Sequence, residues 1–390
     1  MKGHIRKRGK TSWAIVLDLG RDETGKRRQK WHTVRGSYRD AERELARLVH
    51  EMNTGAYVEP SRLRLSEYLD RWMTDYSAHN VAPKTRERYH EMIDGHIAPA
   101  IGNYALSKLK PLHIQGFYSK ALTSGRKDGK GGLSPQTVLH FHRLLHKAFD
   151  QAVKWQLLAN NPCDAVEPPR PERSEMRALD EKETAKLLQL VHGSRLYIPV
   201  AVAVMTGLRR GEILGLRWTD IDLKAMSLAV NQALEQTKAG LRFKTPKTHR
   251  SRRSIALPQT LVDILTAHKA EQAKTRLALG PAYTDNGLVC PRDDGTPWPP
   301  DMLSTAFSAR VRRAKISHVR FHDLRHTHAT HLLRQGVHPK IVSERLGHSQ
   351  VGITLDTYSH VLPGMQDEMV RSLGGMWERL AAQDDESHGA

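Results

Sequence analysis

The sequence predicts a multidomain, mainly helical protein that carries small β-sheets. The chain has 390 residues, whereas a single hydrophobic core stops growing at about 250–300 residues. Apolar residues recur at helical spacing in long blocks, and short strand-like runs occur near the N-terminus and around residues 227–257. A proline-rich stretch without apolar periodicity, residues 160–175, reads as a linker between domains.

Residues 1–57 form the first predicted module, a small sheet with one helix. Its two strands and its helix are expected at residues 12–19, 27–34 and 37–53. Residues 1–39 hold twelve Lys or Arg against three acidic residues, a net charge of +9. A basic sheet of this kind is typical of a module that lays strands in a DNA groove. A solvated basic face without a DNA role is the alternative interpretation.

Residues 63–165 form the second predicted module, a four-helix domain. Proline or an apolar run marks the start of each helix, near Leu65, Pro83, Pro111 and Pro135. Ser134 offers an N-cap directly before Pro135. The aromatic side chains lie at helical spacing, which favours core packing over stacking on bases.

Charge and cysteine content narrow the functional class. The formal charge is +19 and the pI about 10.0, which indicates a polyanionic partner, most simply nucleic acid. Two cysteines, Cys163 and Cys290, lie far apart, so neither a disulfide framework nor a cysteine-rich zinc site is indicated. The longest apolar run, residues 198–205, is too short to span a membrane and reads as a buried helix. We therefore expect a cytoplasmic protein.

Residues 176–365 form the third predicted module, a mixed helical and β domain. The buried helix at residues 196–206 leads into Gly207, where a tight helix end lets Arg209 project. Glu212 follows, either to orient Arg209 or to lie as a carboxylate favoured at a helix start, and both interpretations stay open. Strands at residues 227–233 and 254–257 flank a predicted hairpin at 242–253, which contains six cations and no acid.

The stretch from residue 322 to residue 358 concentrates groups suited to phosphodiester chemistry. It contains His322-Asp323-Leu324-Arg325-His326, then Leu346-Gly347-His348, and then Asp356-Thr357-Tyr358. Arginine forks onto non-bridging phosphate oxygens, histidine moves or holds protons near neutral pH, and tyrosine is a possible covalent nucleophile. Alone, Tyr358 would read as an ordinary helix residue.

These boxes resemble those of the tyrosine recombinases, the phage-integrase family. The family pattern is His-x-x-Arg, then Leu-Gly-His, then a tyrosine about ten residues on. A further box, Thr206-Gly207-Leu208-Arg209-Arg210-Gly211-Glu212, matches the family's Thr-Gly-x-Arg-x-x-Glu. The resemblance implies an arm-type DNA-binding module, a helical core-binding (SAM-like) domain, a mixed α+β catalytic domain and a C-terminal helix and tail, at residues 1–57, 63–165, 176–365 and 366–390.

The resemblance also implies a mechanism. Tyr358 would attack a DNA phosphate to form a 3′-phosphotyrosyl link. Arg209 and Arg325 would bind the non-bridging oxygens and His348 would hydrogen-bond one of them, while His322 would accept the tyrosine proton or hold the phosphate. A lysine of the basic hairpin would protonate the leaving 5′ oxygen. Lys247 fits the family's Lys-Thr pattern best, with Lys244 as the runner-up, and no metal or other cofactor is expected.

The expected partner is double-stranded DNA carrying attachment sites, with core sites and accessory arm sites. The resemblance implies a homotetramer on DNA and an integrase of a phage or integrative element. Such enzymes usually need a DNA-bending host protein or an excision factor.

Other functions compete with this one. His322 and His326 are spaced i, i+4 within the cluster at residues 322–331, as zinc ligands can be, so a metal-dependent DNA hydrolase is one alternative. Against it, no acidic ligand cluster lies nearby and Arg325 sits beside the proposed ligands. A type IB topoisomerase shares the catalytic set, and a catalytically silent DNA-binding regulator is the third alternative.

Overall fold

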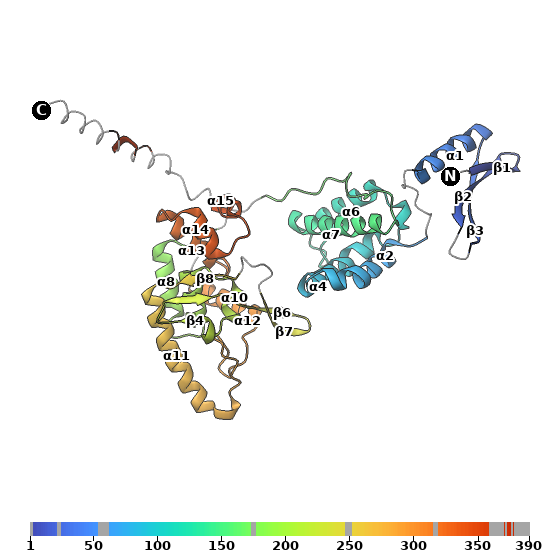
Figure 1. Ribbon diagram of the computed structural model, residues 1–390. Helices are drawn as coiled ribbons and strands as arrows, with labels where there is room; N and C mark the ends of the chain where they lie inside the picture. Colours follow the sequence, from blue (N-terminus) through green and yellow to red (C-terminus); the bar gives the residue numbers. More distant parts are fainter. Residues whose placement is uncertain are drawn as a thin grey trace, which may run out of the picture. The chain divides into compact units, whose positions relative to one another are not determined.

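The structure is a computed structural model of the whole chain, and it describes residues 3–21, 25–53, 62–172, 177–245, 252–314, 319–358, 370, 373–375 and 377. The chain divides into two compact units, Met1–Arg173 and Ser174–Ala390 (Figure 1). Within the described ranges, no helix is both long and apolar enough to cross a membrane.

The N-terminal part is a three-stranded antiparallel sheet with one helix. The strands β1 (Gly3–Gly9), β2 (Ser12–Arg21) and β3 (Arg27–Arg35) pair in sequence order, and α1 (Tyr38–Asn53) packs on one face (Figure 1). The predicted sheet and helix are confirmed, but a prediction of only two strands is wrong. The sequence hides β1 because Ile5 is its only large apolar residue within a run of cations.

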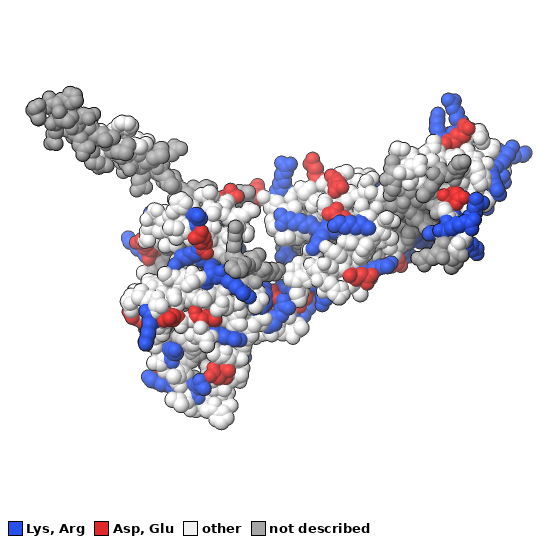
Figure 2. Space-filling view, viewed as in Figure 1, with Lys and Arg blue, Asp and Glu red and all other residues white. Residues whose placement is uncertain are grey.

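The other face of this sheet is open and basic. Ile5 and Ile15 pair across β1 and β2 on the helix side, so Arg6 and its cross-strand neighbours point the opposite way. The Arg6 guanidinium lies 5.5 Å from the ring centroid of Trp31, which is 50% exposed. Arg8 Nη1 donates to Thr33 Oγ1 at 3.2 Å. Figure 2 shows exposed Lys and Arg side chains gathered over this part of the chain.

Four helical rods form the rest of the first unit, as predicted. The first rod joins α2 (Leu65–Trp72), a π-helical turn at Met73–Ser77 and α3 (Ala78–Asn80), and the second joins α4 (Pro83–Met92), a π-helical turn at Ile93–Ile97 and α5 (Ala98–Ile101). A short 3-10 turn, Leu106–Lys108, precedes α6 (Pro111–Ser124) and α7 (Pro135–Lys154). Ser134 caps α7 by accepting from the backbone N–H of Thr137 at 3.2 Å. The aromatic side chains of this region, among them Trp72, Tyr118 and Phe141, are buried in its core.

The second unit packs helices around small sheets. Its helices are α8 (Glu181–Val191), α9 (Tyr197–Thr206), α10 (Arg210–Gly215), α11 (Gln259–Leu279), α12 (Pro300–Arg313), α13 (Asp323–Arg334), α14 (Pro339–Leu346) and α15 (Val351–Tyr358), with 3-10 turns at Trp218–Asp220 and Gly280–Ala282. One sheet orders β4 (Ile221–Asp222), β5 (Ser227–Ala229) and β8 (Ser254–Ala256), and a hairpin pairs β6 (Ala233–Thr237) with β7 (Gly240–Lys244). Apolar side chains of α9 lie at the centre of the main core.

The position predicted for the basic hairpin is wrong. The chain turns before Gly240, whose φ of +116° suits a residue without a side chain. Arg242 and Lys244 therefore lie within β7, where both pair with Glu235 of β6. Residues 246–251, within the predicted hairpin, lie outside the described residues.

Candidate active site

The box around Arg209 is built by the end of a buried helix. α9 is apolar on all sides and ends at Gly207, which adopts the left-handed conformation at φ +69°. A Cβ at this glycine would lie 2.6 Å from Leu346 Cδ2 and 2.7 Å from His328 Cδ2, so no larger residue fits. Leu208 is buried, and Arg209 then starts α10 with its side chain 39% exposed. Gly207 and Leu208 thus place the side chain of Arg209 outside the core, at the start of α10.

The two arginines are held by backbone carbonyls at the ends of α9 and α14. Arg325, on the first turn of α13, donates from Nη1 to the carbonyl of Gly207 at 2.8 Å and from Nη2 to that of Leu346 at 2.7 Å. Arg209 Nη2 donates to the carbonyl of Gly347 at 3.0 Å, where α14 ends on a second left-handed glycine at φ +67°. Residues from three boxes, far apart in sequence, therefore meet at the adjacent carbonyls of residues 346 and 347.

Glu212 and Arg253 hold Arg209 in position. We call the set of Arg209, Arg325, Glu212 and Arg253 the arginine cradle. Glu212 Oε1 and Oε2 accept from Arg209 Nη1 and its backbone N–H, both at 2.9 Å. The same carboxylate accepts from Arg253 Nη1 at 3.2 Å and Nη2 at 2.9 Å, and the two side chains are only 7% and 6% exposed. Both interpretations of Glu212 are therefore correct, since it orients Arg209 and also caps the start of α10.

Crowded cations shape the electrostatics of the cradle. Burial lowers the pKa of Arg325 to about 9, helped by the neighbouring Arg209, so the guanidinium still carries its charge at neutral pH. Burial alone would raise the pKa of Glu212, but its hydrogen bonds and ion pairs with Arg253 and Arg209 lower it overall. The result is a fixed region of positive charge, the environment that a phosphate requires.

Tyr358 and the histidines complete the site. Tyr358 ends α15 and is 2% exposed, and its Oη lies 2.7 Å from Nδ1 of His326. His348 Nδ1 lies 2.8 Å from Oγ1 of the buried Thr354. His322 directly precedes α13 and is exposed, with its ring 5.3 Å from that of His326. Burial, together with the cations of Arg325 and Arg209, lowers the pKa of His348 to about 4.

The structure brings most of the predicted site residues together. Arg209, Arg325, His348 and Tyr358 surround one region, and His322 lies at its edge. Lys247 lies outside the described residues. The ammonium of Lys244, the runner-up, is paired with Glu235.

Two residues beside the nucleophile and the arginines were missed by sequence reasoning. The sequence analysis gives His326 no role in the proposed chemistry, although its place directly after Arg325 in the motif is a usable signal. Arg253 is one of the six cations of the predicted hairpin, and its side chain is buried against Glu212. Its position just before a buried strand was the available signal.

The histidine cluster does not gather as metal ligands in the described part of the chain. His328 Nδ1 lies 2.8 Å from the Val204 carbonyl, and its Nε2 accepts from Arg345 Nε at 3.0 Å. His331 instead lies 3.5 Å from Thr184 Oγ1. His328 is thus a packing residue, and the metal-hydrolase alternative is not favoured.

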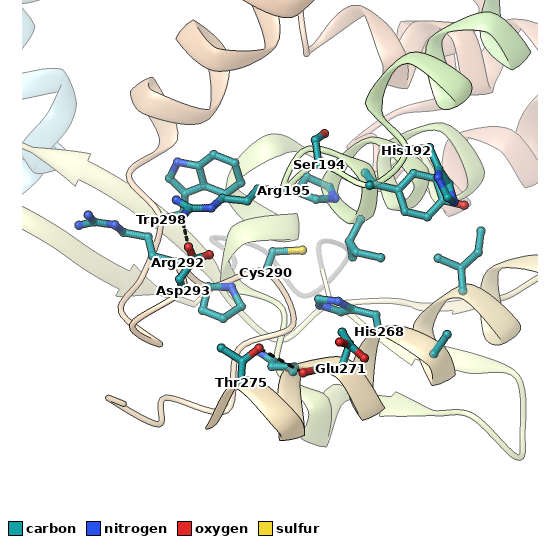
Figure 3. A pocket seen from close by; sticks show the side chains of 18 of the residues that line it. His192, Ser194, Arg195, His268, Glu271, Thr275, Cys290, Arg292, Asp293 and Trp298 are labelled. Carbon is teal, nitrogen blue, oxygen red and sulfur yellow. Dashed lines mark hydrogen bonds and ion pairs between the residues drawn. The ribbon is translucent and has the colours of Figure 1, made fainter. Parts of the chain in front are cut away.

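A large cavity elsewhere in the second unit is separate from this site. It measures about 730 Å³ and lies between the start of α9, α11 and the loop of residues 283–298. Figure 3 shows Cys290, His268 and Trp298 around it, with an ion pair between Arg195 and Asp293 at one side. None of its lining residues belongs to the arginine cradle or to the stretch from residue 322 to residue 358.

Comparison with known proteins identifies the family. Residues 177–364 match the phage integrase family, and residues 64–122 match the N-terminal SAM-like domain of phage integrases. A XerC-like tyrosine recombinase of Caldanaerobacter subterraneus subsp. tengcongensis is 30% identical over 399 residues, covering 96% of this chain and 99% of the relative. The ICEBs1 integrase of Bacillus subtilis is 32% identical over 263 residues, covering 67% and 71%.

Solved structures share the fold. The Tn1549 transposon integrase in complex with a circular intermediate DNA matches with a TM-score of 0.67 at 20% identity, covering 79% of this chain and 99% of that chain. A lambda integrase dimer bound to a core site matches with a TM-score of 0.55 at 19% identity, covering 90% and 93%. The chain belongs to the tyrosine recombinase (phage integrase) family and is a site-specific recombinase, an enzyme that cleaves and rejoins DNA strands.

Proposed function

We propose that Tyr358 is the nucleophile and that Arg209 and Arg325 bind the phosphate that it attacks. The observation that carries this proposal is the position of the two arginines. Their guanidinium groups donate to the carbonyls of residues 207, 346 and 347, and Tyr358 ends the next helix, α15. Cations fixed before the reaction stabilise charge that builds on the non-bridging oxygens, without reorganisation of solvent.

The remaining roles follow from the position of each group. His348, held by Thr354 through Nδ1, offers its other ring nitrogen to a phosphate oxygen. For His322, two roles are compatible with its position, namely holding the phosphate or accepting the tyrosine proton. Lys247 supplies the proton to the leaving 5′ oxygen, since lysine can release a proton where arginine cannot. Tyr358 then carries the DNA through a 3′-phosphotyrosyl bond, and attack by a 5′ hydroxyl reverses the step.

The DNA partner and the assembly are the second part of the proposal. The open face of the N-terminal sheet, with Arg6, Arg8 and Trp31, binds accessory arm sites. The four-helix region binds core-site DNA, and the active assembly is a homotetramer. A lambda integrase tetramer bound to a Holliday junction has the same fold, with a TM-score of 0.52 at 20% identity. The enzyme serves a phage or integrative element, with a DNA-bending host protein or an excision factor as further partners.

A nicked suicide substrate tests the nucleophile. The nick lies next to the crossover, so the cleaved strand is lost and the covalent complex accumulates. Candidate attachment sites come from the DNA that flanks the gene. In EDTA, the wild-type enzyme is expected to form an adduct that resists denaturation, and Tyr358→Phe is expected to bind the same DNA without forming it.

Tyr283→Phe is the matched control, because Tyr283 lies at the remote cavity and touches Gln272. This variant should form the adduct at the wild-type rate. An adduct that survives in Tyr358→Phe contradicts the assignment of the nucleophile. Cleavage of bound DNA only after zinc or magnesium is added contradicts the tyrosine mechanism.

A further inference from the structure

The hydroxyl of Tyr358 has one specific neighbour that can take its proton. Its Oη lies 2.7 Å from Nδ1 of His326, and the two ring centroids are 5.8 Å apart. Tyr358 is 2% exposed, so bulk water has little access to the hydroxyl. A buried hydroxyl at this distance from an imidazole nitrogen is within the range of direct proton transfer.

The charge states of the pair favour a hydrogen bond from tyrosine to histidine. Burial raises the pKa of Tyr358 to about 12, against the opposing effect of the Arg325 cation. Burial and the neighbouring His322 lower the pKa of His326 to about 4. At neutral pH the tyrosine therefore keeps its proton and the imidazole is neutral, which leaves Nδ1 able to accept.

Other potential bases near the nucleophile are engaged elsewhere in the described structure. Arg320 donates to both carboxylate oxygens of Asp323, from Nη2 to Oδ1 at 2.9 Å and from Nε to Oδ2 at 3.1 Å. Glu212 is held by two arginines, and Nδ1 of His348 lies against Thr354. His322 lies one helical turn before His326, is exposed, and makes no hydrogen bond to Tyr358 among the described residues.

We infer that His326, and not His322, is the catalytic base that accepts the proton of Tyr358. The inference rests on the proposed role of Tyr358 as the nucleophile. As Oη forms its bond to phosphorus, the Oη–H bond breaks and the proton moves to Nδ1 of His326. The bond from phosphorus to the 5′ oxygen breaks at the same time, and that oxygen takes a proton from the lysine general acid. In the reverse step, the imidazolium returns its proton to Tyr358 as the 5′ hydroxyl attacks.

This assignment leaves His322 with one role. Its exposed ring lies next to Arg325, on the side open to solvent, and is available to hold a phosphate oxygen. The two histidines then act on different reactants, His326 on the nucleophile and His322 on the phosphate.

Two variants separate proton transfer from simple positioning. In His326→Asn the side-chain amide can still accept a hydrogen bond near the Nδ1 position but cannot carry a proton away. In His326→Ala both functions are lost. We expect single-turnover adduct formation on the suicide substrate to fall by about 10²–10⁴-fold in both variants, with unchanged DNA affinity and, in His326→Asn, a melting temperature close to that of the wild type. A His326→Asn variant that reacts at the wild-type rate overturns the inference.

The pH profile gives a readout that a structural role would not change. From pH 6 to pH 9 the wild-type rate is expected to stay nearly constant, because His326 is neutral throughout. Without the base, tyrosine must ionise by itself, so the His326→Ala rate should rise about tenfold per pH unit. A His326→Ala profile parallel to that of the wild type overturns the inference.

His331→Ala is the matched control on the same helix, because His331 faces Thr184 and not the nucleophile. It should retain the wild-type rate and profile. If the wild-type enzyme forms no adduct at all, the proposed function fails. If the adduct forms normally and His326→Asn is unaffected, only the assignment of the base fails.

Discussion

The arginines of the active-site cradle are held by hydrogen bonds to backbone carbonyls and to Glu212, whereas those of the N-terminal sheet lie on an open surface. Arg325 is 3% exposed and donates to two backbone carbonyls. Arg6 is exposed, lies over the ring of Trp31 and donates from Nε to Nε2 of His4 at 3.1 Å. The same cation can therefore serve two purposes. Held rigidly out of water, it stabilises a transition state; left in water, it contributes affinity that salt can screen.

The largest expected difference between the two regions comes from exchanging arginine for lysine. Arg325→Lys keeps the charge but cannot bridge the carbonyls of Gly207 and Leu346 in one plane. We expect DNA cleavage to fall by about 10³-fold, measured as the rate of adduct formation with bound substrate. Arg6→Lys should leave this rate unchanged. Equal losses in the rate of adduct formation for Arg325→Lys and Arg6→Lys would contradict the distinction between the two regions.

The next effect concerns the buried carboxylate. Glu212→Gln leaves Arg209 and Arg253 without their counter-charge, so the free energy of unfolding should drop by about 3 kcal/mol. Denaturant titration of the full chain measures it. Glu271→Gln is the control, because Glu271 pairs with Lys274 at the surface with 70% of its side chain exposed, and it should cost at most about 0.5 kcal/mol. A Glu212→Gln variant with an unchanged free energy of unfolding would mean that the arginine cradle does not depend on its carboxylate.

Acid should weaken the catalytic unit through its buried histidines. Burial lowers the pKa of His326 to about 4 and that of His328 to about 3, whereas an unfolded histidine titrates near about 6.5. As pH falls from about 6.5 towards these values, the unfolded chain binds protons that the folded chain excludes, so stability decreases. Above about pH 6.5 both states are neutral and this contribution is fully present.

The expected slope is about 1.4 kcal/mol per pH unit for each such histidine. Hydrogen exchange followed by mass spectrometry can monitor peptides of α13 and of the N-terminal strand β2 in one experiment. His328→Asn should remove one histidine's share of the slope in α13. A free energy of opening in α13, corrected for the intrinsic pH dependence of exchange, that does not change between pH 5 and pH 7 would contradict the buried, neutral state of these rings.

The smallest expected effect belongs to the open sheet. Arg6→Ala should weaken arm-site binding modestly and lower the slope of log affinity against log salt by about one. Fluorescence anisotropy with arm-site and core-site fragments at several salt concentrations measures both. Lys274→Ala, far along the chain on α11, should leave the slope unchanged. An unchanged slope in Arg6→Ala would argue against DNA contact by this face.

Local patterns were sufficient for much of this molecule. Helix starts at Ser134 and Pro135 and the buried helix that ends at Gly207 follow from caps and periodicity, whereas Arg209 and Tyr358 stand out only because short boxes around them resemble those of a known family. These features depend on residues a few positions apart, so the sequence displays them directly. The four helical rods and the small sheets follow for the same reason.

Long-range partners could not be predicted in this way. Arg253 finds Glu212 across 41 residues, and His326 finds Tyr358 across 32. Such pairs depend on how helices pack, which no short pattern records. Strand β1 was missed for a different reason, because cations on its open face hide the alternation that marks a strand.

The long sequence separation between the cradle arginines and the carbonyls that hold them also affects when the enzyme can become active during its synthesis. Arg325 reaches back 118 residues to Gly207, and Arg209 waits for Gly347, 138 residues later. A nascent chain that has released only α8 to α12 does not yet contain Arg325, and its Arg209 still lacks the carbonyl of Gly347. Strand cleavage also needs Tyr358, the proposed nucleophile at the end of α15, so a product that terminates before this helix cannot cut DNA.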